Sequence, residues 1–227
     1  MQVLVDSLRA LCQRSPDARI LDIGGWYAPC RYASHIVDIM PFATLRRAHG
    51  YGDGDFRITA ETYHQLDICG GPLPFPDKSF DFIICRHTLE DTRDPIHVCR
   101  EMNRVGRAGY IETPSRVYES TKGVERLWWC GHYHHRWLVE VSGSRIVFQF
   151  KPHNLSASSA FYFRRWPWQE MRDRYRVASL FWDGSFEYSE RVIIDYNELK
   201  DNLRAFKRAH SGMRLFRLRW AKEIDPL

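Results

Sequence analysis

The 227-residue sequence lacks any apolar run that approaches the roughly 18 residues needed to cross a bilayer, which excludes an integral membrane protein. Its six cysteines show no paired spacing, and no charged-then-apolar leader precedes them. We therefore expect a reduced, cytoplasmic protein. Internal repeats, low-complexity runs and linkers are also missing, so we expect one continuous domain over residues 1–227.

Charge of one sign is not strongly in excess. The sequence has 33 Lys and Arg residues and 28 Asp and Glu residues, which gives a net charge of +5. A charge of this size is consistent both with solubility alone and with binding of an anionic partner. With 44% hydrophobic and 27% charged residues, the composition is that of a globular protein with a sizeable core. The positive charge gathers near the end of the chain, at Arg204, Lys207, Arg208, Arg214, Arg217 and Arg219.

Short apolar segments alternate with helical patterns through residue 112. We expect strands at 18–23, 34–39, 63–67, 80–85 and 109–112, and helices at 3–11 and 95–105. This alternation predicts an α/β fold with a mostly parallel central sheet and helices on both faces. The stretch 26–33 contains Pro29 and is too short for a full crossover helix, so the first crossover is abbreviated.

The pattern changes beyond Pro114. Residues 136–141 and 145–150 flank the turn residues 142–144, which predicts a β-hairpin, and 196–210 predicts an amphipathic helix. We therefore divide the domain into a core over 1–115 and a C-terminal hairpin and helix elaboration over 116–227.

Acids, glycines and cations follow the predicted strands. In an open α/β sheet the ligand binds at the carboxyl ends of the strands. A nucleotide-like ligand would explain the set, because glycines admit its backbone contacts and acids accept its hydroxyl and amino hydrogens. A dinucleotide favours Gly-x-Gly-x-x-Gly, whereas Trp26 and Tyr27 follow the glycines here. S-adenosylmethionine has no phosphate and tolerates this loop better. The strand-end residues are Asp22, Gly24, Gly25, Asp38, Asp67, Arg86 and His87.

Four stretches give the chain a family resemblance. They are Ile-Leu-Asp-Ile-Gly-Gly at 20–25, Val-Asp at 37–38, Leu-Pro-Phe-Pro-Asp-Lys-Ser-Phe-Asp at 73–81 and His-Thr-Leu-Glu-Asp at 87–91. Together they resemble the class I S-adenosylmethionine-dependent methyltransferases, and the stretch 73–81 is the most specific. The resemblance covers about residues 19–114 and implies a Rossmann-like fold and S-adenosylmethionine as cofactor.

The resemblance also implies roles for individual residues. Asp22, Gly24 and Gly25 would line the methionine end of the cofactor. Asp38 would hold the ribose, Ile39 would flank the ring, and Asp67 with Ile68 would border the adenine. Arg86 joins this cofactor-binding set from the end of its strand. The sequence departs from the family at Trp26, where a further glycine is usual, and at Asp91, where a histidine is usual.

Histidines are the candidate catalytic residues, since methylation of a hydroxyl benefits from a general base. His87 follows a predicted strand beside the expected methyl group. His132, His134 and His135 form the most unusual local composition, and they serve either as a base-bearing acceptor site or as a structural cluster. With Cys130 they match no common metal-ligand spacing, and in an extended strand His135 would point away from the other two. We therefore favour the other two roles over Zn²⁺ or another divalent ion at this cluster, and assign no metal ligand.

The segments 109–115 and 135–139 are similar to a bacterial branch of these enzymes tied to glycans or small molecules. We expect O-methylation of a small-molecule or glycan-like acceptor, with the elaboration forming the acceptor site. One alternative is an RNA-directed methyltransferase, because 161–168 interleaves aromatic residues with cations. The other is a non-catalytic protein that binds the cofactor or a partner.

Overall fold

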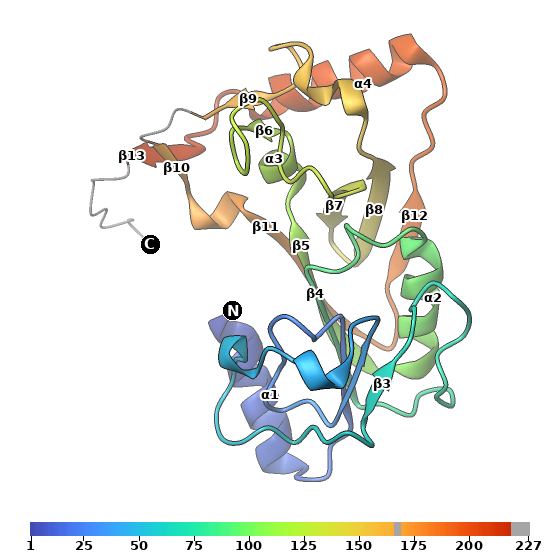
Figure 1. Cartoon of the computed structure of the whole chain (residues 1–227). Helices are drawn as coiled ribbons and strands as arrows, with labels where there is room; N and C mark the ends of the chain where they lie inside the picture. The colour runs from blue at the N-terminus through green and yellow to red at the C-terminus, as the bar shows by residue number, and fades with distance from the viewer. Residues whose placement is uncertain (166–168, 219–227) are drawn as a thin grey trace. The chain divides into compact units, whose positions relative to one another are not determined.

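The computed structural model describes residues 1–165 and 169–218, and its contacts divide the chain into two compact units (Figure 1). The first unit comprises Met1–Thr113, Val141–Ile146 and Ser179–Ser189. The second comprises Pro114–Glu140, Val147–Ala178 and Glu190–Leu227. The single continuous domain expected from the sequence stays a prediction.

A six-stranded sheet organises the first unit. Its strand order is β11-β5-β4-β1-β2-β3, with five parallel strands and β11 antiparallel at the edge. This order confirms the predicted α/β fold with a mostly parallel sheet. The strands are β1 (Ile20–Ile23), β2 (His35–Asp38), β3 (Tyr63–Gln65), β4 (Phe82–Arg86), β5 (Ala108–Pro114) and β11 (Val177–Asp183).

Apolar residues alternate between the two faces of this sheet, as the period of a strand requires. On one face Ile20 and Ile84 pack with Leu4 and Leu8 of helix α1 (Gln2–Arg14). Ile83 belongs to the opposite face, where it lies close to the end of helix α2 (Pro95–Val105). Figure 1 shows α1 and α2 on different sides of β4. Helices therefore cover both faces, as predicted.

The crossover from β1 to β2 contains no helix, which confirms the abbreviated connection. Instead, the chain makes an excursion after β2 through two short 3-10 helices, η1 (Phe42–Thr44) and η2 (Arg47–His49). The excursion brings Tyr51 back to form a parallel bridge with Cys30. The backbone N–H of Arg31 donates to the Tyr51 carbonyl at 2.9 Å. The excursion thus packs against the chain that leaves β1.

The predicted hairpin is confirmed as β7 (Trp137–Ser142) and β8 (Arg145–Phe150), which form a three-stranded sheet with β12 (Glu187–Glu190). Helix α4 (Tyr196–His210) has the predicted bounds and begins at Asp195, whose carboxylate accepts two backbone N–H groups. The sequence did not predict β11, β12, η1 or η2, nor the remaining short elements. These are α3 (Arg116–Glu119), β6 (Thr121–Lys122), η3 (His153–Ser156), β9 (Phe163–Arg164), β10 (Gln169–Met171), η4 (Asp173–Tyr175) and β13 (Phe216–Leu218).

None of the helices within the described residues has the length and apolar character needed to cross a bilayer.

Candidate functional site

A tight glycine turn ends β1. Gly24 adopts a positive φ of 76°, and a Cβ there would lie 2.0 Å from Oγ1 of Thr88. A Cβ on Gly25 would lie 2.6 Å from Oδ2 of Asp22. Both positions therefore exclude a side chain unless their neighbours move. The absence of these side chains lets the ends of β1 and β4 approach each other closely.

Asp22 lies beneath this turn with 3% of its surface exposed. Its Oδ2 accepts the backbone N–H of Cys30 at 2.9 Å. Burial raises the pKa of Asp22 to about 7, against the opposing effects of the Cys30 hydrogen bond and the charge of Arg86. Asp22 is thus divided between the protonated and ionised forms near neutral pH.

Asp38 ends β2 with its carboxylate held by backbone donors. The N–H of Trp26 donates to Oδ2 at 3.0 Å, and the N–H of Met40 donates to Oδ1 at 2.9 Å. Burial raises the pKa of Asp38, although these hydrogen bonds oppose the shift. Ile39 follows with 64% of its surface exposed. The end of β2 therefore presents a fixed acid beside an accessible apolar side chain.

Asp67 lies two residues beyond the end of β3. Its Oδ1 accepts the backbone N–H of Cys69 at 2.9 Å, and its Oδ2 forms an ion pair with Arg93. The hydrogen bonds from Cys69 and Arg93 lower the pKa of Asp67. Ile68, the next residue, is partly exposed. The structure thus places Asp67 in a local turn that is pinned by a cation.

Glu112 of β5 is the centre of a buried charge network. Its Oε1 accepts hydrogen bonds from Nε and a terminal nitrogen of Arg86 at 3.1 and 2.8 Å, and its Oε2 accepts the Tyr110 hydroxyl at 2.6 Å. Burial alone would raise the pKa of Glu112, but His87 and Arg86 hold it well below its usual range. The Arg86 guanidinium also lies 4.7 Å from the ring centroid of Tyr51.

His87 is held between two buried acids. Its Nε2 lies 3.2 Å from Glu112 Oε1, and its Nδ1 lies 3.7 Å from Glu90 Oε1. Burial lowers the pKa of His87, but the two glutamates outweigh this effect and raise it to about 9. His87 is therefore a cation at neutral pH. In this state it has no lone pair with which to act as the general base that the sequence suggested.

Glu90 is 1% exposed, and neither of its carboxylate oxygens has a hydrogen-bond partner within the described residues. The Nδ1 atom of His87 lies 3.7 Å from Glu90 Oε1 and is a charged neighbour of this carboxyl group. Sequence analysis missed Glu90, Glu112 and Tyr51 as site residues. Glu112 carried a usable signal, because it follows the apolar run of β5 as Asp38 follows that of β2. Tyr51 had none, since it reaches the site through the long excursion.

Comparison with known proteins agrees with this geometry. Residues 34–111 match the family model described as a methyltransferase domain. The demethylmenaquinone methyltransferase of Geobacillus stearothermophilus is 25% identical over 130 residues, which cover 55% of this chain and 53% of that protein. The enzyme of the same name from Listeria monocytogenes serotype 4a (strain HCC23) is 25% identical over 142 residues, covering 60% and 54%. The chain thus spans about half the length of the curated relatives it matches.

Over residues 34–111 the chain is thus similar to a methyltransferase domain, which agrees with the resemblance to class I S-adenosylmethionine-dependent methyltransferases seen in the sequence. Among solved structures, an S-adenosylmethionine-dependent methyltransferase from Mesorhizobium loti is 18% identical, with a TM-score of 0.35 and coverage of 64% of this chain and 62% of that one.

The end of β2 fits the adenosine half of the family's cofactor. Each Asp38 oxygen accepts one backbone N–H and keeps a lone pair for a ribose hydroxyl. Ile39 offers an exposed apolar surface for a ring. The end of β1, where the sequence predicts the methionine end of the cofactor, is less open, because Asp22 is only 3% exposed and Glu112 already neutralises Arg86.

The second unit contains another buried glutamate. Glu119 of α3 is fully buried and contacts two basic side chains. Its Oε1 lies 2.9 Å from Nδ1 of His135, and its Oε2 accepts a hydrogen bond from Nζ of Lys151 at 2.6 Å. Lys151 also donates to the carbonyl of His132 at 2.6 Å. Nothing in the sequence pattern singled out Glu119 or Lys151, because 32 positions separate them and neither belongs to a motif.

The three clustered histidines converge, contrary to the sequence expectation for His135. Nitrogen atoms of His132, His134 and His135 all lie within 4.8 Å of one another. The expectation assumed an extended strand, but the backbone bends at Tyr133 and His134, between the first and the last of the three histidines. Burial and the neighbouring His135 lower the pKa of His132. Cys130 lies apart from this group, in a hydrophobic cluster.

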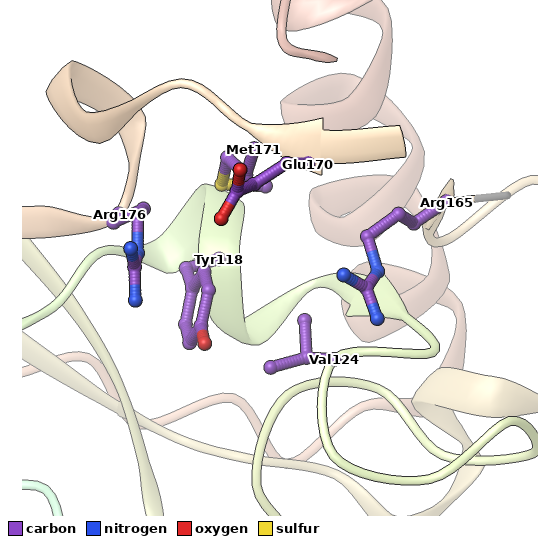
Figure 2. A pocket seen from close by; sticks show the side chains of 6 residues that line it. All are labelled: Tyr118, Val124, Arg165, Glu170, Met171 and Arg176. Atoms are coloured by element: carbon purple, nitrogen blue, oxygen red, sulfur yellow. The ribbon is translucent and has the colours of Figure 1, made fainter. Parts of the chain in front are cut away.

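A small polar pocket of about 70 Å³ also lies in the second unit (Figure 2). Figure 2 shows Arg176 and Arg165 on opposite sides of Tyr118. The pocket has room for a small polar group rather than a whole acceptor molecule.

The aromatic and cationic segment proposed for RNA binding is only partly accessible. Phe161 and Phe163 are buried in hydrophobic clusters, and residues 166–168 lie outside the described part of the chain. Of the basic tail, Arg219 also lies outside the described residues, whereas Arg214 is exposed and Arg217 lies 3.8 Å from Glu170. Buried phenylalanines cannot stack on bases without local unfolding.

Proposed function

We propose that this protein transfers a methyl group from S-adenosylmethionine to a hydroxyl of a small-molecule or glycan-like acceptor. The arrangement at Asp38 carries the proposal: a buried carboxylate at a strand end, fixed by two backbone donors, beside the exposed Ile39. Bound there, S-adenosylmethionine would supply a methyl group that passes to the acceptor oxygen, while the sulfur keeps the electron pair of the broken bond and a base takes the hydroxyl proton.

The charges around the strand ends support a cationic cofactor. Among the described residues of the first unit, the acids Asp22, Glu90 and Glu112 lie near the cations Arg86 and His87. Acids in a water-poor setting stabilise a neighbouring positive charge more than water does. A sulfonium or ammonium group meets that condition.

The proton of the acceptor hydroxyl needs a different residue from His87. His87 carries a proton at neutral pH, whereas the pKa of His132 is lowered by burial and by its histidine neighbours. His132, His134 and His135 stay the other candidate bases that the sequence predicts. Alanine replacement of these residues should reduce turnover and leave the affinity for S-adenosylmethionine unchanged.

The first experiment is a calorimetric titration with S-adenosylmethionine and S-adenosylhomocysteine, with NAD as a negative control. Replacement of Asp38 by alanine removes the acceptor of both ribose hydroxyls, and since hydrogen bonds to charged groups contribute about 1.5–3 kcal/mol, affinity should fall more than tenfold. Asp38→Asn keeps the shape and should give an intermediate loss. Asp55→Ala, at an exposed acid outside the strand ends, is the matched control. Unchanged affinity in Asp38→Ala with an intact thermal transition would refute the cofactor assignment.

A second experiment identifies the acceptor class. The protein is incubated with S-adenosylmethionine carrying a labelled methyl group and with separate small-molecule, glycan and RNA fractions. Label in a small-molecule or glycan fraction supports the proposal. Label in RNA would support the RNA-directed alternative, and cofactor binding without label in any fraction would support a non-catalytic role. The cytoplasmic location stays a prediction.

A further inference from the structure

Three imidazole rings of the second unit are packed at the spacing of a metal centre. The ring centroids lie 4.6 Å apart for His132 and His135, 4.5 Å for His134 and His135, and 5.6 Å for His132 and His134. With Zn–N bonds of about 2.0–2.1 Å, three histidines on a tetrahedral ion would place their ring centroids about 5.2 Å apart. The observed separations fall on both sides of this value.

The cluster has the support that metal-binding histidines usually have. A ligating histidine commonly gives its other ring nitrogen to a carboxylate, which fixes the ring and its tautomer. Nδ1 of His135 lies 2.9 Å from the fully buried Glu119, and Lys151 holds the second oxygen of that glutamate. The ring of His135 is therefore oriented by a charged pair beneath it, with Nε2 on its opposite edge.

The backbone that carries the three rings is also fixed. The carbonyl of His132 accepts from Lys151, so the same lysine anchors both the loop and the glutamate. Glu125 accepts the N–H of Tyr133 at 3.0 Å and lies 3.7 Å from Nδ1 of His132. A second carboxylate therefore stands beside a second histidine of the cluster.

We propose that His132, His134 and His135 bind one divalent transition-metal ion, with Glu119 and Glu125 as positioning residues. Imidazole ligands favour Zn²⁺, Co²⁺, Ni²⁺ and Cu²⁺ over Mg²⁺ and Ca²⁺, which prefer oxygen. Three protein ligands leave one position for water or an oxygen of another molecule, as in catalytic zinc sites. Metal binding does not depend on the proposed methyl transfer. If methyl transfer also holds, the ion would lower the pKa of a coordinated acceptor hydroxyl in place of a histidine base.

The test uses the full chain, free of any polyhistidine tag and stripped with a chelator. Titration with ZnCl2 by calorimetry should give one site per chain, and CoCl2 should give the visible absorption of a tetrahedral nitrogen-rich centre. A thiolate-to-cobalt charge-transfer band would assign the metal to one of the six free cysteines and overturn the proposal. Absence of saturable binding would also overturn it.

His134→Asn is the decisive variant, because His134 is exposed and its replacement should not disturb the core. It should weaken Zn²⁺ binding at least tenfold and remove the cobalt spectrum, and His134→Asp should restore part of both. His153→Asn removes another exposed histidine of the same unit and should change neither. Equal binding in His134→Asn and His153→Asn would refute the site. Titration with S-adenosylmethionine in the stripped and loaded protein separates this result from the cofactor proposal.

Discussion

The two units each contain a buried glutamate that bridges a permanent cation and a histidine. In the first unit Glu112 joins Arg86 to His87, and in the second Glu119 joins Lys151 to His135. The surroundings differ. His87 faces a further acid, Glu90, and is held as a cation, whereas beside His135 the ring of His132 has a pKa lowered by burial and by its histidine neighbours.

This difference shows that a Glu–His pair does not have a fixed chemical role. A second acid favours a charged imidazolium, which can stabilise an anion or donate a hydrogen bond. Around His132, burial and the neighbouring His135 and His134 disfavour protonation, which leaves a nitrogen lone pair for a proton or a metal ion. The same pairing of residue types therefore points to charge stabilisation in one unit and to ligation or base chemistry in the other.

The largest effect should come from breaking the bridge in the second unit. Glu119→Gln leaves Lys151 buried without a counter-charge, and loss of one partner of a buried pair costs about 3–5 kcal/mol. Urea denaturation should show this loss, whereas Glu125→Gln, at a more exposed acid, should cost under about 1 kcal/mol. The double variant Glu119→Gln, Lys151→Met should recover part of the stability. If the double variant is no more stable than Glu119→Gln, the ion pair is not the source of the effect.

The second-largest effect is the change in the free energy of unfolding with pH that Asp22 of the first unit should cause. The folded-state pKa of Asp22 is about 7, above its unfolded value near 3.8, so the folded state binds more protons between these values. The free energy of unfolding should therefore fall as pH rises from about 4 to 7, by at most about 4 kcal/mol. Asp22→Asn should flatten this part of the profile, measured by urea denaturation at several pH values. An unchanged slope in the variant would contradict the assignment to Asp22.

A smaller effect tests the glycine turn beside Glu119. A Cβ at Gly131 would lie 2.3 Å from Oε2 of Glu119, whereas at Gly143, with nearly the same positive φ, a Cβ would meet nothing within 4 Å. Gly143→Ala should therefore cost about 1 kcal/mol for backbone strain alone. Gly131→Ala should cost about 1–3 kcal/mol more, because Glu119 must move. Equal losses in thermal unfolding would mean that the contact with Glu119 is unimportant.

The smallest effect concerns the charge of His87. Its folded pKa of about 9 exceeds the unfolded value near 6.5, so its contribution to stability is complete below pH 6.5 and disappears as pH rises through 9. Because the side chain is nearly half exposed, we expect less than about 1 kcal/mol. His87→Asn should remove this change between pH 6.5 and 9, and NMR titration of the imidazole would measure the pKa directly. A titration midpoint near 6.5 would show that Glu90 and Glu112 do not hold the proton.

The sequence predicted the parts of the molecule that depend on local pattern. The five parallel strands of the sheet, the hairpin at 137–150 and helix α4 followed from apolar periodicity and turn residues, whereas β11 was not predicted. Asp22, Asp38 and Asp67 were found because strand ends meet at one edge of a parallel sheet. The histidines were noticed by composition, but their convergence was missed, since it depends on the bends at Tyr133 and His134 and on contacts of this segment with Glu119 and Glu125.

The sequence by itself therefore determined the α/β sheet, the short first crossover and the set of strand-end acids, because these follow from neighbouring residues and strand order. Only the tertiary structure decided the charge state of His87, the burial of Glu119 with Lys151 and the approach of the three histidines. Each of these depends on groups that are distant in the chain and that fold together away from water. Burial changes the free energy of a charged group and therefore its pKa, and the spacing of residues in the sequence does not show which groups are buried.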